Sequence, residues 1–82
     1  MNIDYLLKEI TRFNDEKYEE YEDIVDTFIN SEIKDNNKKD IYLYQLSRIN
    51  LDYKISSPFE ENYFIMKLHG LLIKIKNYLN FI

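Results

Sequence analysis

The scarcity of turn-forming residues constrains this chain more than any other feature of its sequence. Its 82 residues include one glycine, Gly70, and one proline, Pro58. A β-sandwich or β-barrel needs many tight turns, and those turns draw heavily on glycine. The glycine-rich loops that cradle phosphate groups are excluded as well, because neither GxGxxG nor GxxxxGK[ST] occurs. We therefore expect a helical fold.

The rest of the composition narrows the class of protein further. Hydrophobic residues make up 45% of the chain and charged residues 32%, as in folded globular domains. With no cysteine and one histidine, the chain cannot form disulfides, cysteine-ligated metal sites or multi-histidine clusters. No apolar run approaches the roughly 18 residues that span a bilayer, and the N-terminus lacks the pattern of a secretory signal. We expect a cytoplasmic protein without a cofactor or a bound metal.

The amino-acid usage also suggests an origin. The chain contains no alanine and one valine, whereas isoleucine, asparagine, lysine, tyrosine and phenylalanine fill more than half of it. All five of these residues can be written with AT-rich codons. The expected source is an AT-rich bacterial, phage or mobile-element genome.

Helical periodicity is clear in the N-terminal part of the chain. Apolar residues recur at i, i+3, i+4 and i+7 between residues 3 and 13, and Asn2 is placed to cap the first turn. The same period resumes over residues 15–33, after a break near Asn14. Because the apolar stripe hardly changes phase across this break, the pattern fits either two helices or one long helix over 3–33.

The middle of the chain is ambiguous. Residues 34–40 contain no apolar side chain and two adjacent asparagines, which predicts a loop. Apolar residues within 41–55 fit a helix face, but those from Ile49 onward also alternate with polar ones, as in a strand. We favour a helix over about 38–50 followed by an extended connector, because a lone strand would have no partner. The pattern leaves open whether residues 49–55 are extended or helical.

The C-terminal segment carries the strongest helix signal. Ser57, Pro58 and Glu60 form a capping box with proline in the first turn, which predicts a helix over 57–81. One face of this helix is continuously apolar, with Phe64, Leu68, Leu71, Leu72, Ile75 and Leu79.

A second, weaker apolar face on this helix comprises Phe59, Tyr63, Met66 and Ile73. A helix that is apolar on two sides is usually packed by neighbours on both. Gly70 would then mark a close crossing with one of those neighbours. A competing interpretation makes Gly70 the turn of a hairpin formed by 63–68 and 71–76, but this leaves the capping box without a purpose.

Together these patterns predict an all-α fold. We expect residues 1–82 to form one domain, a compact bundle of three or four helices with a long, largely buried C-terminal helix. Such a bundle folds from mostly local contacts, which suits a short chain. No acid, base and nucleophile stand at catalytic spacing, so we do not expect an enzyme.

Acidic residues gather in the first part of the chain. Residues 1–33 carry a net charge of −7, whereas the rest carry +3. On a helix the carboxylates would line the side opposite the apolar face, and the candidate partner-binding residues are Glu16, Glu19, Glu20, Asp23 and Asp26. Like charges four residues apart cost roughly 0.2–0.5 kcal/mol per pair. The acids form either a docking face for a basic surface or a solvated face favoured by the helix N-terminus.

Two functions are compatible with these features. The first is a small inhibitor from a phage or mobile element, of the anti-defence or immunity type, whose acidic face occupies a basic surface of a larger protein. The second is a structural subunit that self-associates as a homodimer through the second apolar face of the C-terminal helix. Because acids dilute the basic residues, we expect neither direct nucleic-acid binding nor membrane binding.

Overall fold

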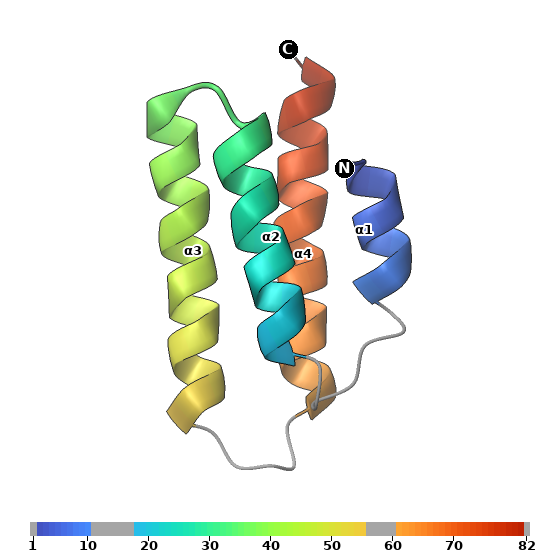
Figure 1. Ribbon diagram of the computed structural model, residues 1–82, viewed down its shortest axis with the longest axis vertical. Coiled ribbons are helices and arrows are strands. Elements are labelled where there is room, and N and C mark those ends of the chain that lie inside the picture. Colours follow the sequence, from blue (N-terminus) through green and yellow to red (C-terminus); the bar gives the residue numbers. More distant parts are fainter. Residues whose placement is uncertain (1, 11–17, 56–60, 82) are drawn as a thin grey trace.

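The computed structural model describes residues 2–10, 18–55 and 61–81. These residues form four helices, α1 (Ile3–Ile10), α2 (Tyr18–Glu32), α3 (Asn36–Ile55) and α4 (Glu61–Phe81). Successive helices alternate in direction, and both ends of the chain lie at the same end of the bundle (Figure 1). The main helix contacts join α1 to α4, α4 to α3, and α3 to α2. The prediction of an all-α bundle with a long C-terminal helix is confirmed, and α4 buries one face against the other helices.

The N-terminal part of the chain forms two helices rather than one. The Tyr21 hydroxyl on α2 donates a hydrogen bond to the carbonyl oxygen of Leu6 on α1. In one continuous helix these two residues would stand about 22 Å apart along the axis, so the chain must reverse between them. The predicted break near Asn14 lies outside the described residues.

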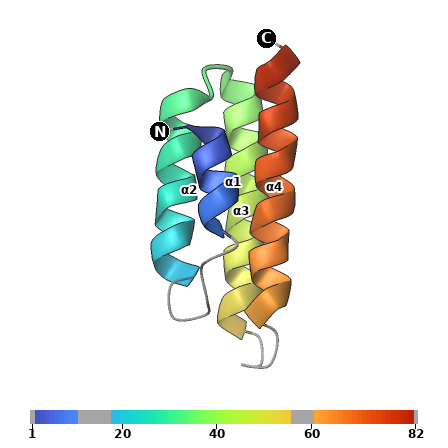
Figure 2. The same ribbon diagram turned by 90° about the vertical axis from the view of Figure 1, so that its right-hand side faces the viewer.

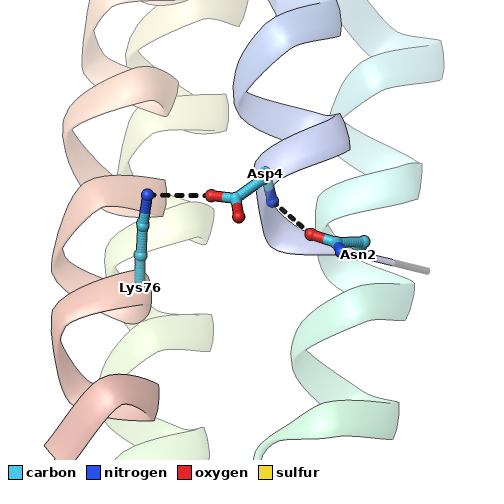
Figure 3. A network of polar contacts seen from close by, with 3 residues as sticks. All are labelled: Asn2, Asp4 and Lys76. Atoms are coloured by element: carbon cyan, nitrogen blue, oxygen red, sulfur yellow. Dashed lines mark hydrogen bonds and ion pairs between the residues drawn. The ribbon is translucent and has the colours of Figure 1, made fainter.

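The short helix α1 is capped and docked by polar contacts at its start (Figure 3). The backbone N–H of Asp4 donates to Oδ1 of Asn2 at 2.7 Å, which confirms Asn2 as the cap. The Asp4 carboxylate also lies 2.8 Å from the Lys76 ammonium on α4. The Asp4 side chain is 65% exposed and that of Lys76 is 37% exposed, so solvent screens this pair and it contributes at most about 1 kcal/mol. The buried side chains of Leu6 and Ile10 therefore supply most of the docking energy.

Helix α3 begins earlier than the sequence pattern predicts. The backbone N–H of Lys38 donates to Oδ1 of Asp35 at 3.1 Å, so Asp35 is the N-cap of α3. The predicted loop over 34–40 is therefore wrong for most of its length, and the connection between α2 and α3 comprises residues 33–35.

Helix α3 also ends later than predicted, because it continues to Ile55, and the extended connector predicted after about residue 50 is wrong. Ile49 and Tyr53 pack against the core, whereas Leu51 and Ile55 are exposed on the other side of the same helix. Apolar residues on two opposite sides of a helix produce an alternation along the sequence that resembles a strand.

The core lies between the four helices. Its buried members are Leu6, Ile10, Tyr18, Tyr21, Val25, Phe28, Ile29, Ile33, Tyr42, Leu46, Phe64, Leu68, Leu71, Leu72 and Ile75. The predicted apolar face of α4 supplies five of them, and Leu79 is partly buried beside them. The helical path over 61–81 excludes the hairpin interpretation. The capping box at Ser57 lies outside the described residues.

The second apolar face of α4 is uncovered in the monomer. Tyr63, Met66 and Ile73 are exposed, and Met66 reaches 72% exposure. The described residues therefore do not provide the expected neighbours on both sides of this helix. Gly70 marks no close crossing either, because a Cβ added there would meet nothing within 4 Å.

Candidate interaction surfaces

Helix α2 presents its carboxylates away from the core. Glu19, Glu20 and Asp23 are exposed, and Asp26 is partly exposed on the same side of the helix. The structure thus brings together four of the five predicted partner-binding residues, while Glu16 lies outside the described residues. We call Glu19, Glu20, Asp23 and Asp26 the acidic face.

One edge of the acidic face adjoins α3. Glu19 and Asp23, together with Glu22, line a recess of about 220 Å³ whose other wall is formed by Asn50 and Lys54. Lys54 places a cation at this edge. Within the described residues, however, neither Glu19 nor Asp23 lies at ion-pair distance from a cation.

The environment of α2 shifts the pKa of one of its carboxyl groups, that of Glu22. Partial burial against α3 raises the pKa of its carboxyl group, and the charges of Asp23 and Asp26 raise it further. A hydrogen bond with Asp23 acts in the same direction, whereas Lys54 acts in the opposite one. A cation delivered by a partner would relieve this repulsion, because an opposite charge favours the ionised carboxylate.

Two fully buried tyrosines lie on the inner side of α2. The ring of Tyr18 stacks on Tyr53, with ring centroids 3.9 Å apart and an interplanar angle of 19°. The Tyr18 hydroxyl has no hydrogen-bond partner among the described residues, and the same holds for Oδ1 of Asn50. Burial raises the pKa of both Tyr18 and Tyr21.

A larger groove of about 490 Å³ lies between α3 and α4. It is lined by Tyr44, Gln45, Arg48, Ile49, Asp52, Tyr63, Phe64, Met66, Lys67, Gly70, Leu71 and Lys74. Its lining therefore combines an apolar floor with three cations and one carboxylate. Two residues of the second apolar face of α4, Tyr63 and Met66, belong to it.

Sequence reasoning missed an exposed apolar row on α3. Ile41, Tyr44, Leu51 and Ile55 are 47%, 63%, 49% and 75% exposed. Together with Arg48 they follow spacings of 3, 4, 3 and 4 residues, the seam spacing of a coiled coil. We call these five residues the α3 seam. The spacing is present in the sequence, but an extended connector would have removed Leu51 and Ile55 from the helix.

Membrane spans, metal-binding groups and known relatives would each indicate what kind of site the chain carries. Among the described residues, no helix is long and apolar enough to cross a membrane, and no three acidic or histidine side chains are grouped so that they could hold a metal ion. Comparison with protein-family models, with curated proteins and with solved structures finds no match.

Proposed function

We propose that this chain is a small non-enzymatic protein-binding module that docks onto a basic surface of a larger protein through the acidic face of α2. One observation carries the proposal: Glu19, Glu20 and Asp23 stand exposed together, without an ion pair to a cation of the described chain. The raised pKa of the adjacent Glu22 supports it, because the helix tolerates a repulsion that a basic partner would remove.

Binding of this kind gains both speed and selectivity from charge. A cluster of like charges steers a complementary surface during diffusion, and it disfavours partners of the wrong sign. An exposed row of carboxylates can occupy sites on the partner that otherwise hold phosphate groups. The small size, the net charge of −4 and the AT-rich residue usage fit an inhibitor from a phage or mobile element, of the anti-defence or immunity type.

The test is a binding comparison between two charge-matched variants. The first variant, Glu19→Lys/Asp23→Lys, reverses the acidic face. The second, Glu32→Lys/Asp40→Lys, changes the net charge equally at two other exposed positions. Wild-type chain is used to capture a partner from cells of the source organism, and the purified partner is then titrated at low and high salt.

We expect the captured partner to be larger and basic, and its affinity to fall with salt because exposed charges are screened. Reversal of the acidic face should weaken binding by at least about tenfold, equivalent to about 1.4 kcal/mol, while the matched control binds nearly as wild type does. Equal affinities for the two variants would contradict the proposal, provided that circular dichroism shows both to be folded.

A second candidate function is self-association through the second apolar face of α4. The exposure of Tyr63, Met66 and Ile73 favours it, because these side chains have no cover in the monomer. Tyr63→Asp or Ile73→Asp should then convert a dimer into a monomer in sedimentation velocity. A wild-type chain that stays monomeric at high concentration would rule this function out.

A further inference from the structure

Helix α3 is apolar on two opposite sides, and the bundle covers only one of them. Its inner side carries Tyr42 and Leu46, which are buried. Its outer side carries the α3 seam, in which four large apolar side chains are each about half exposed or more. Large apolar side chains exposed together along one side of a helix commonly mark an interaction site.

The spacing of the seam indicates what kind of surface would cover it. Positions separated by 3, 4, 3 and 4 residues stay on one side of a helix over several turns, so a second helix can pack along them with knobs in holes. The seam extends over most of α3, a helix of 20 residues and therefore about 30 Å long. Arg48 is the one polar member, at its centre. A single polar residue in such a seam sets the register at some cost in stability.

We propose that the seam is covered by α3 of a second copy of this chain, in an antiparallel two-fold dimer. The inference concerns a surface other than the acidic face, so it stands independently of docking through that face. It is an alternative to self-association through the second apolar face of α4, and Ile73→Asp distinguishes the two dimers. Charge complementarity selects the occupant. Arg48 and Asp52 carry opposite charges one turn apart, and both lie on the flank of α3 that borders the groove with α4.

The symmetry of the pair determines which charges meet. In an antiparallel two-fold pair, the same flank of each helix lies on the same side of the interface, and residues pair about a common centre. With the centre near residue 50, Arg48 of one copy lies opposite Asp52 of the second copy, and the contact occurs twice. Tyr44 of one copy then packs against Ile55 of the second. A parallel pair would instead bring Arg48 against its own equivalent.

The interface does not end at one helix. Tyr44 lines the groove together with Tyr63 and Met66, so the apolar surface continues from the seam onto α4. This continuity matters because a specific, stable interface buries roughly 1,200–2,000 Å² in total. The charges beside the seam have both signs, which distinguishes this surface from a membrane-binding helix with a uniformly basic polar face.

The first test is the oligomeric state of the full chain. We expect sedimentation velocity and light scattering to give twice the 10.1 kDa mass of one chain, with dissociation on dilution. Leu51→Glu and Tyr44→Glu should each raise the dimer dissociation constant by roughly a hundredfold, the order expected for hot-spot residues. Ile73→Asp should leave the dimer intact, because it changes the α4 face and not the seam.

The second test is a charge swap that only a reciprocal contact can satisfy. Arg48→Glu or Asp52→Arg alone should weaken the dimer by roughly tenfold, because each places like charges opposite one another twice. The combined variant Arg48→Glu/Asp52→Arg should restore the wild-type dissociation constant. Circular dichroism identifies any variant that fails to fold, and Leu51→Gln then replaces Leu51→Glu as the milder change.

Three results would overturn the proposal. They are a wild-type chain that is monomeric at every concentration, a dimer that Leu51→Glu and Tyr44→Glu leave intact, and a charge swap that fails to restore association. A monomer that binds phospholipid vesicles, or a peptide from another protein, through the seam would likewise exclude the second copy as its occupant. None of these results bears on binding through the acidic face, so the two proposals fail separately.

Discussion

Removing one hydroxyl group from each of the two buried tyrosines of α2 should change stability in opposite directions. Tyr18 and Tyr21 lie one turn apart, and both are fully buried. The Tyr21 hydroxyl donates to the carbonyl oxygen of Leu6, whereas the Tyr18 hydroxyl has no partner among the described residues. Phenylalanine preserves the ring in both cases, including the stack of Tyr18 on Tyr53. The two variants therefore measure separately how a hydrogen-bonded hydroxyl and an unpaired hydroxyl affect the stability of the protein.

The magnitudes follow from the two environments. Burying a hydroxyl without a hydrogen bond costs about 1–3 kcal/mol in proteins, so Tyr18→Phe should raise the free energy of unfolding by about 1 kcal/mol. A typical buried hydrogen bond contributes about 1 kcal/mol net, so Tyr21→Phe should lower it by a similar amount. For a domain of 82 residues, the thermal midpoint moves by roughly 4–8 °C per kcal/mol. The two midpoints should thus lie about 8–16 °C apart.

Urea and thermal denaturation, followed by circular dichroism, measure both variants directly. Tyr5→Phe is the control, because Tyr5 is 57% exposed and its change should stay within about 0.5 kcal/mol. If Tyr18→Phe loses as much stability as Tyr21→Phe, the Tyr18 hydroxyl is hydrogen-bonded in solution and the reasoning is refuted.

The same tyrosines predict how stability depends on alkaline pH. Burial raises the pKa of Tyr18 and Tyr21 in the folded state, while the unfolded chain loses these protons near pH 10. The free energy of unfolding should therefore be insensitive to these groups below pH 10. Above it, stability should fall by up to about 1.4 kcal/mol per pH unit for each tyrosine. The variant Tyr18→Phe/Tyr21→Phe should show a shallower decline in urea titrations between about pH 9 and 11.

Three further substitutions test separate parts of the fold. Gly70→Ala should raise the free energy of unfolding by about 0.5–1 kcal/mol, because its added Cβ meets nothing within 4 Å; a loss in urea denaturation would reveal a contact there. Glu22→Gln should stabilise the protein at neutral pH and have no effect below about pH 4, because burial and nearby acids raise the pKa of Glu22 and so disfavour its charged form in the folded state. Thermal midpoints of wild type and Glu22→Gln, measured from about pH 4 to neutral pH, test this. A difference between the two midpoints that does not change with pH would contradict the prediction. Asp35→Ala should lower the free energy of unfolding by about 0.5–2 kcal/mol in urea denaturation, because it removes the N-cap of α3. The control Asp40→Ala should change stability by less than about 0.5 kcal/mol. Equal effects of the two substitutions would show that Asp35 does not stabilise α3 as its cap.

Local periodicity was sufficient to predict the buried faces of three helices. The rows that contain Leu6 and Ile10, Tyr21 and Phe28, and Leu68 and Ile75 all point into the core. Such rows can be recognised in the sequence because a helix with one apolar and one polar side can pack in only one orientation. The up-down arrangement then follows from short connections between neighbouring helices.

The same reasoning failed where both sides of a helix are apolar. Between Ile49 and Ile55, inward and outward apolar residues alternate, so the helix resembles a strand when the sequence is read alone. Nothing local distinguishes an apolar side that is packed by the chain from one that is left open. For the same reason, the exposure of Met66 and Tyr63 could not be predicted from the pattern of α4.

The acidic face was predictable, but its surroundings were not. The helical period alone places Glu19 and Asp23 opposite the buried row of α2. The neighbouring Lys54 and Asn50 come from α3, and only the packing of two helices brings them to that edge. The burial that raises the pKa of Glu22 arises from the same packing.

The pairing of α1 with α4 has a consequence for the order of events during synthesis (Figure 2). Helix α1 has its most extensive contacts with α4, which is synthesised after α2 and α3, so α1 cannot complete its packing until α4 has emerged. The hairpin of α2 and α3 is complete in sequence at Ile55, so it can assemble once Ile55 has left the ribosome. Closure of the bundle therefore waits until α4 has emerged, and only then can Lys76 pair with Asp4.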